Sequence, residues 1–182
     1  MSDTTVQPTT YTVDPAHSGI RFWVRHLMIS KVHGTMGGIT GTVSGVPGDA
    51  SSIKVDISIP TNTISTGQEQ RDGHIKNADF LDVETYPTMT FVSKSATKTG
   101  ASTYDVVGAL TLHGVTKDVT LKAEVTDEVA SPFGGFKVGV NATCEIDRED
   151  FGVTYNKALE TGGVMVGKEI HIEIDLEIDR AA

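Results

Sequence analysis

The sequence predicts an all-β protein, and three observations support this fold class. Apolar and polar residues alternate without interruption from Ile170 to Asp179, and similar alternation recurs along most of the chain. Alternation with a period of two places one face of a strand against a dry interior and the other against water. A helical period of 3.6 residues is almost absent, and the 19 glycines suit turns and bends in curved strands. One-sided strands of this kind must stack as two sheets or close into one barrel.

Each predicted strand is bounded by turn-forming residues such as Asp14-Pro15, Pro60 or Lys98-Thr99-Gly100. Repeated glycines between residues 32 and 45 indicate a strand that bends sharply or runs close to another backbone. In chain order, the predicted strands are 11–14, 20–25, 32–45, 53–59, 89–97, 104–112, 119–125, 136–146 and 166–179.

Two segments depart from the β pattern. The polar run 68–77 predicts a short helix with Ser65 or Thr66 as its cap, and we expect this helix to cover one end of the β structure. The segment 156–163 predicts a second short helix or a loop.

About eight long strands with hairpin-scale connections are typical of an up-and-down antiparallel barrel or of a sandwich. The run from Ile170 to Ile178 spans about 30 Å at ~3.3 Å per residue, which is long for a small sandwich and favours the barrel. An eight-stranded barrel is either filled by side chains or holds one slim ligand. We expect a flexible tail at 1–10 and one barrel domain at 11–180.

The composition disfavours several partners and compartments. A net charge of -9 and a pI near 5.0 argue against nucleic acid or an anionic membrane surface as the main partner. No window approaches the ~18 apolar residues of a membrane span, so we expect no stable membrane insertion. The N-terminus lacks the features of a secretory signal, and the single Cys144 is consistent with a reducing compartment. These observations predict a cytoplasmic protein.

Several polar residues offer chemistry, and each has a simpler structural explanation. Asp14, His17 and Ser18 are the ingredients of a nucleophilic triad, but such groups usually converge from distant loops, and a hydrogen-bonded turn is simpler. His171 shares a strand face with acidic residues, where a solvated surface is the simpler interpretation. Cys144 falls on the apolar phase of its strand and is interpreted as a packed small hydrophobe. We assign no catalytic residue, metal or cofactor.

The segment Arg71-Asp72-Gly73-His74 is the densest charged cluster. It is either the polar side of a surface helix or a set of hydrogen-bond partners for the head group of a ligand at the barrel entrance.

Taken together and in order, several segments resemble the YceI-like family, the lipocalin-like polyisoprenoid-binding proteins. The matching stretches are 11–18, 22–28, 71–82, 86–91, 108–117, 148–152 and 159–169. The similarity covers nearly all residues from Tyr11 to Ile178, and the ordered set is more specific than any one motif.

This resemblance implies an extended eight-stranded antiparallel lipocalin-like barrel with one or two short helices and an elongated apolar pore. It also implies a binding or transport protein, and not an enzyme, for polyprenyl chains, isoprenoid quinones or fatty-acid derivatives. A homodimer is a further expectation from the family. The chain departs from many relatives in lacking an export signal, and in having 35–41 where relatives tend to be rich in aromatic residues.

We therefore expect the chain to bind, sequester or transport one long isoprenoid or acyl lipid in the barrel pore. A stress-related interaction module without lipid ranks second, and an enzyme acting on an isoprenoid-like substrate ranks third. Arg71, Asp72 and His74 are the candidates for the lipid head group. The candidate pore lining is Ile20, Phe22, Val24, Val55, Ile57, Met89, Phe91, Leu110, Leu112, Leu121, Val138, Val140, Ile172 and Ile174.

Overall fold

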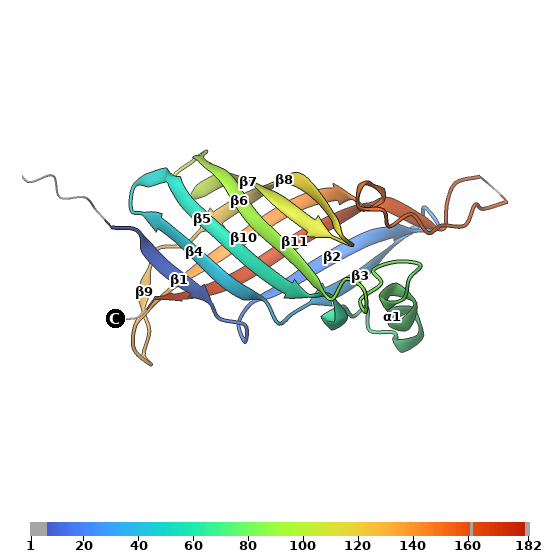
Figure 1. Cartoon of the computed structure of the whole chain (residues 1–182), viewed down its shortest axis with the longest axis horizontal. Helices are drawn as coiled ribbons and strands as arrows, with labels where there is room; N and C mark the ends of the chain where they lie inside the picture. The colour runs from blue at the N-terminus through green and yellow to red at the C-terminus, as the bar shows by residue number, and fades with distance from the viewer. Residues whose placement is uncertain (1–6, 161, 181–182) are drawn as a thin grey trace, which may run out of the picture.

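The computed structural model describes residues 7–160 and 162–180, and antiparallel strands make up most of it (Figure 1). One α-helix, α1 (Glu69–Lys76), and two 3-10 helices, η1 (Thr61–Thr63) and η2 (Arg148–Phe151), lie between strands. The strands are β1 (Thr9–Val13), β2 (Gly19–His26), β3 (Ser30–Met36), β4 (Thr40–Val46), β5 (Asp49–Pro60), β6 (Thr88–Lys98), β7 (Thr103–Leu112), β8 (Val115–Val125), β9 (Val129–Ala130), β10 (Phe136–Asp147) and β11 (Val166–Arg180).

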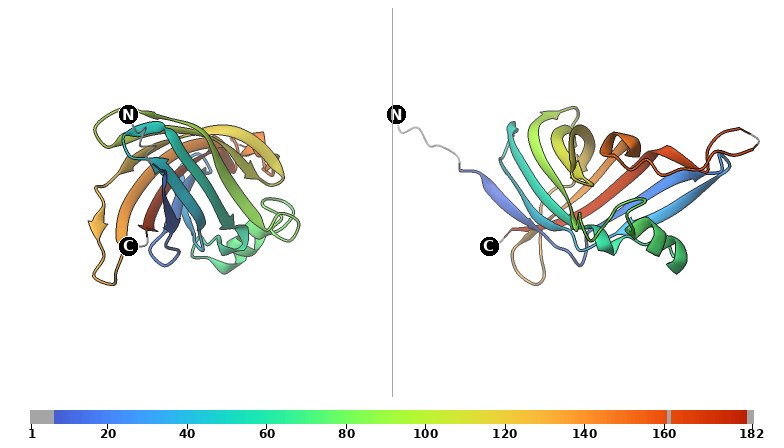
Figure 2. Two further views of the ribbon diagram at one scale, coloured as in Figure 1. Left: turned by 60° about the vertical axis from the view of Figure 1, so that its left-hand side comes forward. Right: turned by 45° about the vertical axis from the view of Figure 1, so that its right-hand side comes forward.

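Eight of these strands close a barrel in the order β11-β1-β4-β5-β6-β7-β8-β10. The ring closes between β10 and β11, which pair antiparallel from Phe136 opposite Arg180 to Asp147 opposite Glu169. Figure 2 shows the strands curving round into one continuous wall. The predicted all-β class and the eight-stranded antiparallel barrel are confirmed, and the sandwich is excluded because one sheet closes on itself.

Two lines of the barrel wall are interrupted, one between β1 and β2 and the other between β4 and β3. The strands β2 and β3 lengthen the molecule beyond the ring. The last strand, β11, pairs with β2 from Val166 to Asp175 and with β1 at Ile178 and Asp179. In the same way β3 continues the line of β4, since β3 pairs with β2 and β4 pairs with β1. The predicted single strand at 32–45 is therefore two strands.

Glycine allows this interrupted region to pack closely. A Cβ atom on Gly34 would lie 2.3 Å from Cζ of Phe22, and one on Gly41, which has φ of 142°, would lie 2.0 Å from the carbonyl oxygen of Asp56. Both positions need glycine because any side chain would collide with the neighbouring strand. The predicted close approach to another backbone is confirmed at Gly41.

Helix α1 begins one residue after Gln68, whose side-chain oxygen accepts a hydrogen bond from the backbone N–H of Arg71 at 2.8 Å. The expectation that Ser65 or Thr66 caps the helix is wrong. Both hydroxyls instead donate to the carboxylate of Asp72, and these bonds tie the incoming loop to the first turn of the helix.

The remaining connections define the ends of the fold. Within the described residues of 156–163 there is no helix, and this loop is held by a β-bridge between Ala158 and Val164. Of the predicted tail, residues 1–6 lie outside the described part, and β1 already begins at Thr9. Over 7–160 and 162–180, the structure contains no helix with the length and apolar character needed to cross a bilayer.

Candidate functional site

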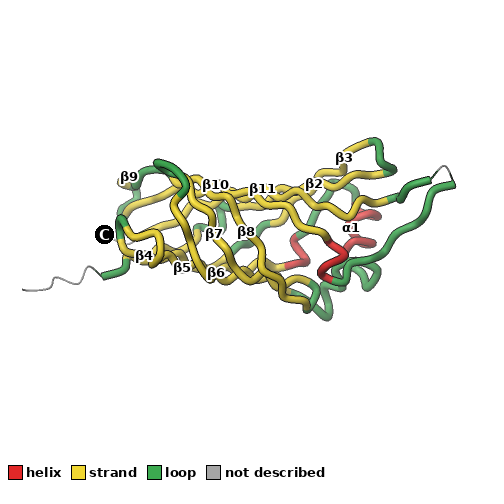
Figure 3. Tube along the Cα trace, turned by 90° about the horizontal axis from the view of Figure 1, so that it is seen from above, coloured by secondary structure: helices red, strands yellow, loops and turns green. Residues whose placement is uncertain are grey.

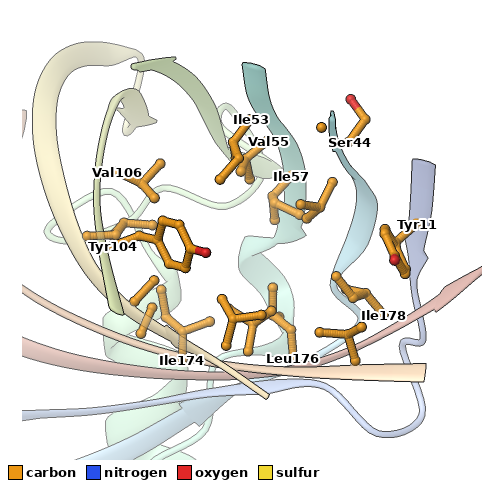
Figure 4. Close-up of a pocket in the computed structure, with 18 of the residues that line it drawn as sticks. Tyr11, Ser44, Ile53, Val55, Ile57, Tyr104, Val106, Ile174, Leu176 and Ile178 are labelled. Carbon is orange, nitrogen blue, oxygen red and sulfur yellow. The ribbon is translucent and has the colours of Figure 1, made fainter. Parts of the chain in front are cut away.

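The inward faces of the barrel strands enclose an apolar cavity of about 490 Å³, here called cavity 1 (Figure 4). Ile174, Leu176 and Ile178 of β11 point into it, and Val55 and Ile57 of β5 face them across the space. This volume lies in the range of small-molecule sites. The cavity exists because aliphatic residues that alternate with polar ones meet across the barrel without filling it.

A second apolar cavity of about 250 Å³, cavity 2, lies where β2, β3 and β11 extend past the ring. Phe22 and Val24 of β2 line one wall, and Ile75 and Leu81 from the α1 segment line another. Figure 3 shows α1 beside the end of the molecule formed by β2 and β3. The expectation that the helical segment covers one end of the β structure is confirmed.

The two cavities meet at three side chains. Ile20, Met89 and Ile172 belong to the lining of both cavities. Met89 is the adaptable member of this wall, because its unbranched thioether side chain has more rotatable bonds than isoleucine. These three side chains therefore form the boundary between the two cavities.

Every residue of the predicted pore lining lies on the wall of one of the cavities. Their contact with a lipid stays a prediction. Cavity 1 takes Ile20, Val55, Ile57, Met89, Phe91, Leu110, Leu121, Val138, Val140, Ile172 and Ile174, and cavity 2 takes Ile20, Phe22, Val24, Met89, Leu112 and Ile172.

The three residues expected to hold a lipid head group already have polar partners. Arg71 donates from Nε to Oγ1 of Thr66 at 2.7 Å and from Nη2 to the carbonyl oxygen of Thr66 at 3.0 Å. His74 has its Nε2 atom 2.7 Å from Oδ2 of Asp79. Arg71 and His74 border cavity 2, and these bonds engage Nε and Nη2 of Arg71 and Nε2 of His74 with protein groups.

Asp72, the third of these residues, lines neither cavity. Its carboxylate accepts hydrogen bonds from the hydroxyls of Ser65 and Thr66 and from the backbone N–H of Thr66. The hydroxyl of Thr66 is the main reason that the pKa of Asp72 lies below its ordinary value. Asp72 therefore stabilises the loop before α1.

Sequence reasoning missed the polar rim of cavity 1. The Tyr104 hydroxyl points into this cavity and has no hydrogen-bond partner among residues 7–160 and 162–180 (Figure 4). Lys98 lies beside it, with Nζ 5.8 Å from the centroid of the Tyr104 ring. Alternation in the strand 104–112 does not show where a phenol oxygen lies.

The opposite side of the rim is tied together by Glu128. Its carboxylate accepts a hydrogen bond from the Tyr11 hydroxyl at 2.6 Å and pairs with Arg180 at 2.6 Å. Burial, followed by the hydrogen bond to Glu128, raises the pKa of Tyr11. Asp49 and Asp127 also line this rim, so acidic groups outnumber the cations Lys98 and Arg180 there.

Arg148, in η2, is a buried cation on the wall of cavity 2 that sequence reasoning also missed. Its side chain is 4% exposed and donates to the carbonyl oxygens of Gly167, Val153 and Val166. Burial lowers its pKa from the usual value. It fastens the loop that follows η2 to the start of β11, and no apolar or helical period marks such a residue.

The other reactive groups fit structural roles. The Asp14 carboxylate accepts from the N–H of Ala16, and the Ser18 hydroxyl accepts from the N–H of Glu177, so the predicted hydrogen-bonded turn is present. His171 lies 2.8 Å from Glu145 on the outer surface and stacks on Trp23. Cys144 borders cavity 1, and burial raises the pKa of its thiol to about 11.

The YceI-like domain model matches residues 11–178 of this chain. UPF0312 proteins of Staphylococcus aureus strains MSSA476 and USA300 are 39% and 38% identical over 170 residues, which cover 93% of this chain and 96% of each relative.

Solved structures share the fold. BcnA of Burkholderia cenocepacia superposes with a TM-score of 0.79 at 24% identity, over 91% of this chain and 98% of BcnA. The YceI protein of Campylobacter jejuni gives 0.71 at 28% identity, over 87% and 90% of the two chains. A polyisoprenoid binding domain from Saccharophagus degradans gives 0.69 at 15% identity, over 94% of this chain and 99% of that domain. With a closed barrel, a matching family model and curated relatives along nearly its whole length, the chain belongs to the YceI-like domain family.

Proposed function

We propose that this protein binds and carries one long-chain amphiphilic lipid, such as a polyisoprenoid, an isoprenoid quinone or a fatty-acid derivative. The observation that carries the proposal is a pair of adjoining apolar cavities, one inside the closed barrel and one where β2, β3 and β11 extend past it. The Saccharophagus degradans neighbour, described as a polyisoprenoid binding domain, supports the same ligand class.

Burial of the hydrocarbon tail supplies the affinity. Each buried methylene contributes about 0.8 kcal/mol, so ten buried carbons contribute roughly 8 kcal/mol before ordering costs are subtracted. Without those costs this value would correspond to a dissociation constant near 1 μM, so a tail of ten buried carbons binds more weakly than that. The tail extends through cavity 1, past Ile20, Met89 and Ile172, and into cavity 2.

The head group lies at the rim of cavity 1. The Tyr104 hydroxyl supplies a hydrogen bond that no described protein group uses, whereas Arg71 and His74 at the other end are engaged with Thr66 and Asp79. Acidic residues at the rim favour an uncharged head, such as a quinone or an alcohol, over a phosphate, because like charges repel. The expectation that Arg71, Asp72 and His74 hold the head group stays the alternative to this placement.

Organic extraction of purified protein followed by mass spectrometry tests the ligand directly. The expected result is a long-chain isoprenoid or acyl lipid in near-stoichiometric amount, together with saturable binding of a polyprenyl quinone probe by the delipidated protein. Absence of both would overturn the proposal and favour the interaction module. Gel filtration of the same samples tests the expected homodimer, and fractionation of the source cells tests the predicted cytoplasmic location.

Removal of one oxygen atom tests the position of the head group. Tyr104→Phe should weaken binding of the quinone probe by about 2- to 10-fold, the usual worth of one hydrogen bond, and leave a tail-matched hydrocarbon unaffected. Arg71→Met is the matched change at the other end and should leave both affinities unchanged. The reverse pattern would place the head group at cavity 2.

A further inference from the structure

The strands β2 and β3 are joined by a tight turn, and its two central residues are of types that disfavour the backbone conformation of the turn. Ile29 N–H donates to the carbonyl oxygen of His26 at 3.0 Å, and Leu27 and Met28 between them have φ of 52° and 60°. Positive φ at both central positions defines a type I′ turn, which favours Asn-Gly. Leucine and methionine are strained there, and strain of this kind gathers at functional sites.

The same turn exposes its apolar side chains. Leu27, Met28 and Ile29, here called the apolar tip, are 38%, 59% and 77% exposed. The tip lies where β2 and β3 end, far from the barrel ring, next to the 157–165 loop (Figures 1 and 3). Leu27 N–H donates to the carbonyl oxygen of Met165 at 2.8 Å and fixes the tip against that loop. Folding gains little from Met28 and Ile29, which are mostly exposed in a strained turn, and contact with another surface would explain them.

Cationic residues lie on the strands and on the loop next to the apolar tip. Arg25 donates from Nη1 to the carbonyl oxygen of Ile29 at 3.3 Å, and the Lys31 ammonium lies 3.8 Å from the centroid of the Trp23 ring. Lys157 on the adjoining loop accepts a backbone hydrogen bond from Met165, and Glu160 is the acidic residue of that loop. The tip strands and the adjoining loop thus carry the three cations Arg25, Lys31 and Lys157 and the one acid Glu160, in a chain of net charge -9. The overall charge alone had argued against an anionic surface.

Cavity 2 reaches the base of the apolar tip. Arg25 and His26, which precede the tip, and Met165 and Val166, which face it, all line this cavity. A surface that contacts the apolar tip therefore lies next to the end of cavity 2.

We propose that the apolar tip docks on the surface of an anionic lipid bilayer, with its side chains in the head-group layer and Arg25, Lys31 and Lys157 on the lipid phosphates. Apolar insertion next to basic residues is the chemistry of peripheral binding to anionic membranes. Transfer of a lipid between the bilayer and cavity 2 at this contact rests, in addition, on the function proposed above.

Flotation of the full-length protein with phosphatidylcholine vesicles, with or without 25% phosphatidylglycerol, tests docking. Wild type should float with the anionic vesicles, less so in 0.5 M salt. The variant L27N/M28G/I29T should lose at least tenfold in vesicle binding while its melting temperature is unchanged or higher, since Asn-Gly suits the turn. Phe133→Asn, which removes a side chain that is 94% exposed in another loop, is the matched control and should float like wild type.

Unchanged flotation of the triple variant, or loss of flotation in Phe133→Asn, would overturn the proposal. So would a wild type that forms dimers through the tip and ignores vesicles, a result that analytical ultracentrifugation detects. Binding of the quinone probe in vesicle-free buffer should be equal in wild type and the triple variant. Failure of that binding in both proteins would refute the lipid-binding function without bearing on docking.

Discussion

Nδ1 of His17 lies 2.7 Å from Oδ2 of Asp14, inside the turn that separates β1 from β2. This contact and the N–H of Ala16 lower the pKa of Asp14 to about 2, and Asp14 in turn raises the pKa of His17. Lys137 of β10 lies 3.5 Å from the same carboxylate oxygen. The turn is thus linked to the strand pair that closes the barrel.

The Asp14 pair predicts a pH dependence of folding. Because the folded pKa of Asp14 is depressed, its contribution to stability is complete above pH ~4 and is lost as the pH falls towards 2. His17, with a raised pKa, contributes fully below pH ~6.5 and loses that contribution as the pH rises further. Asp14→Asn should lower stability at pH 5 and flatten both slopes in urea unfolding curves. Equal slopes in wild type and variant would contradict this, and Asp118→Asn, in an exposed pair with Lys94, is the control.

Filling cavity 1 should abolish lipid binding without unfolding the barrel. Ala142 is buried on β10 and faces this cavity, so the ring of Ala142→Phe enters empty space and costs no more than about 1–3 kcal/mol of stability. Affinity for the quinone probe should fall by at least tenfold. Thr143→Phe adds the same ring on the outer face of β10 and should keep wild-type binding. Equal affinities in the two variants would show that the ligand does not occupy cavity 1.

The thiol of Cys144 should report occupancy of cavity 1. With its pKa raised to about 11 by burial, it carries an about 100-fold smaller thiolate fraction at pH 8 than an unburied cysteine, and it should react correspondingly slowly with Ellman's reagent. Lipid binding should slow the reaction further, because Cys144 borders the tail. Reaction in 8 M urea gives the unprotected rate. A rate in folded protein equal to that in urea would show that the thiol is not buried.

Arg148 should be among the most costly residues to remove. Arg148→Ala leaves the carbonyl groups of Gly167, Val153 and Val166 without their donor, and a buried unsatisfied group costs about 1–3 kcal/mol. We expect a loss of at least ~3 kcal/mol in urea unfolding. Arg21→Ala, which breaks an exposed pair with Asp175, should cost no more than about 1 kcal/mol. Comparable losses in the two variants would argue against this role for Arg148.

The alternation of apolar and polar residues predicted the barrel wall, because successive side chains of a strand point alternately into the barrel and out to solvent. The face of β11 that holds Ile172 and Ile174 was assigned from that period, and both residues line the cavities. Breaks in a strand were harder to predict. The Asp14 turn was expected from sequence, but the split of 32–45 into β3 and β4 was not, since glycine marks both bends and close contacts.

The hydrogen-bond partners of individual side chains could not be predicted from the sequence. The partners of Arg71 and His74, Thr66 and Asp79, lie five residues away along the chain, but no periodic pattern marks these contacts. Tyr104 and Arg148 were missed for the converse reason, since one is a polar atom on an apolar face and the other a charge inside the protein. Three-dimensional proximity decides these cases, and periodicity carries no information about it.

Closure of the ring by β11 has a consequence for how the protein is made. Residues 166–180 pair with β1, β2 and β10, so a nascent chain that still lacks them carries unpaired edges on both flanks of its sheet. At a translation rate of about 5–20 residues per second, those edges stay open for seconds on the ribosome, where they can recruit strands from other chains. Cellular yield should therefore depend on chaperone shielding during synthesis more than on the stability of the finished barrel.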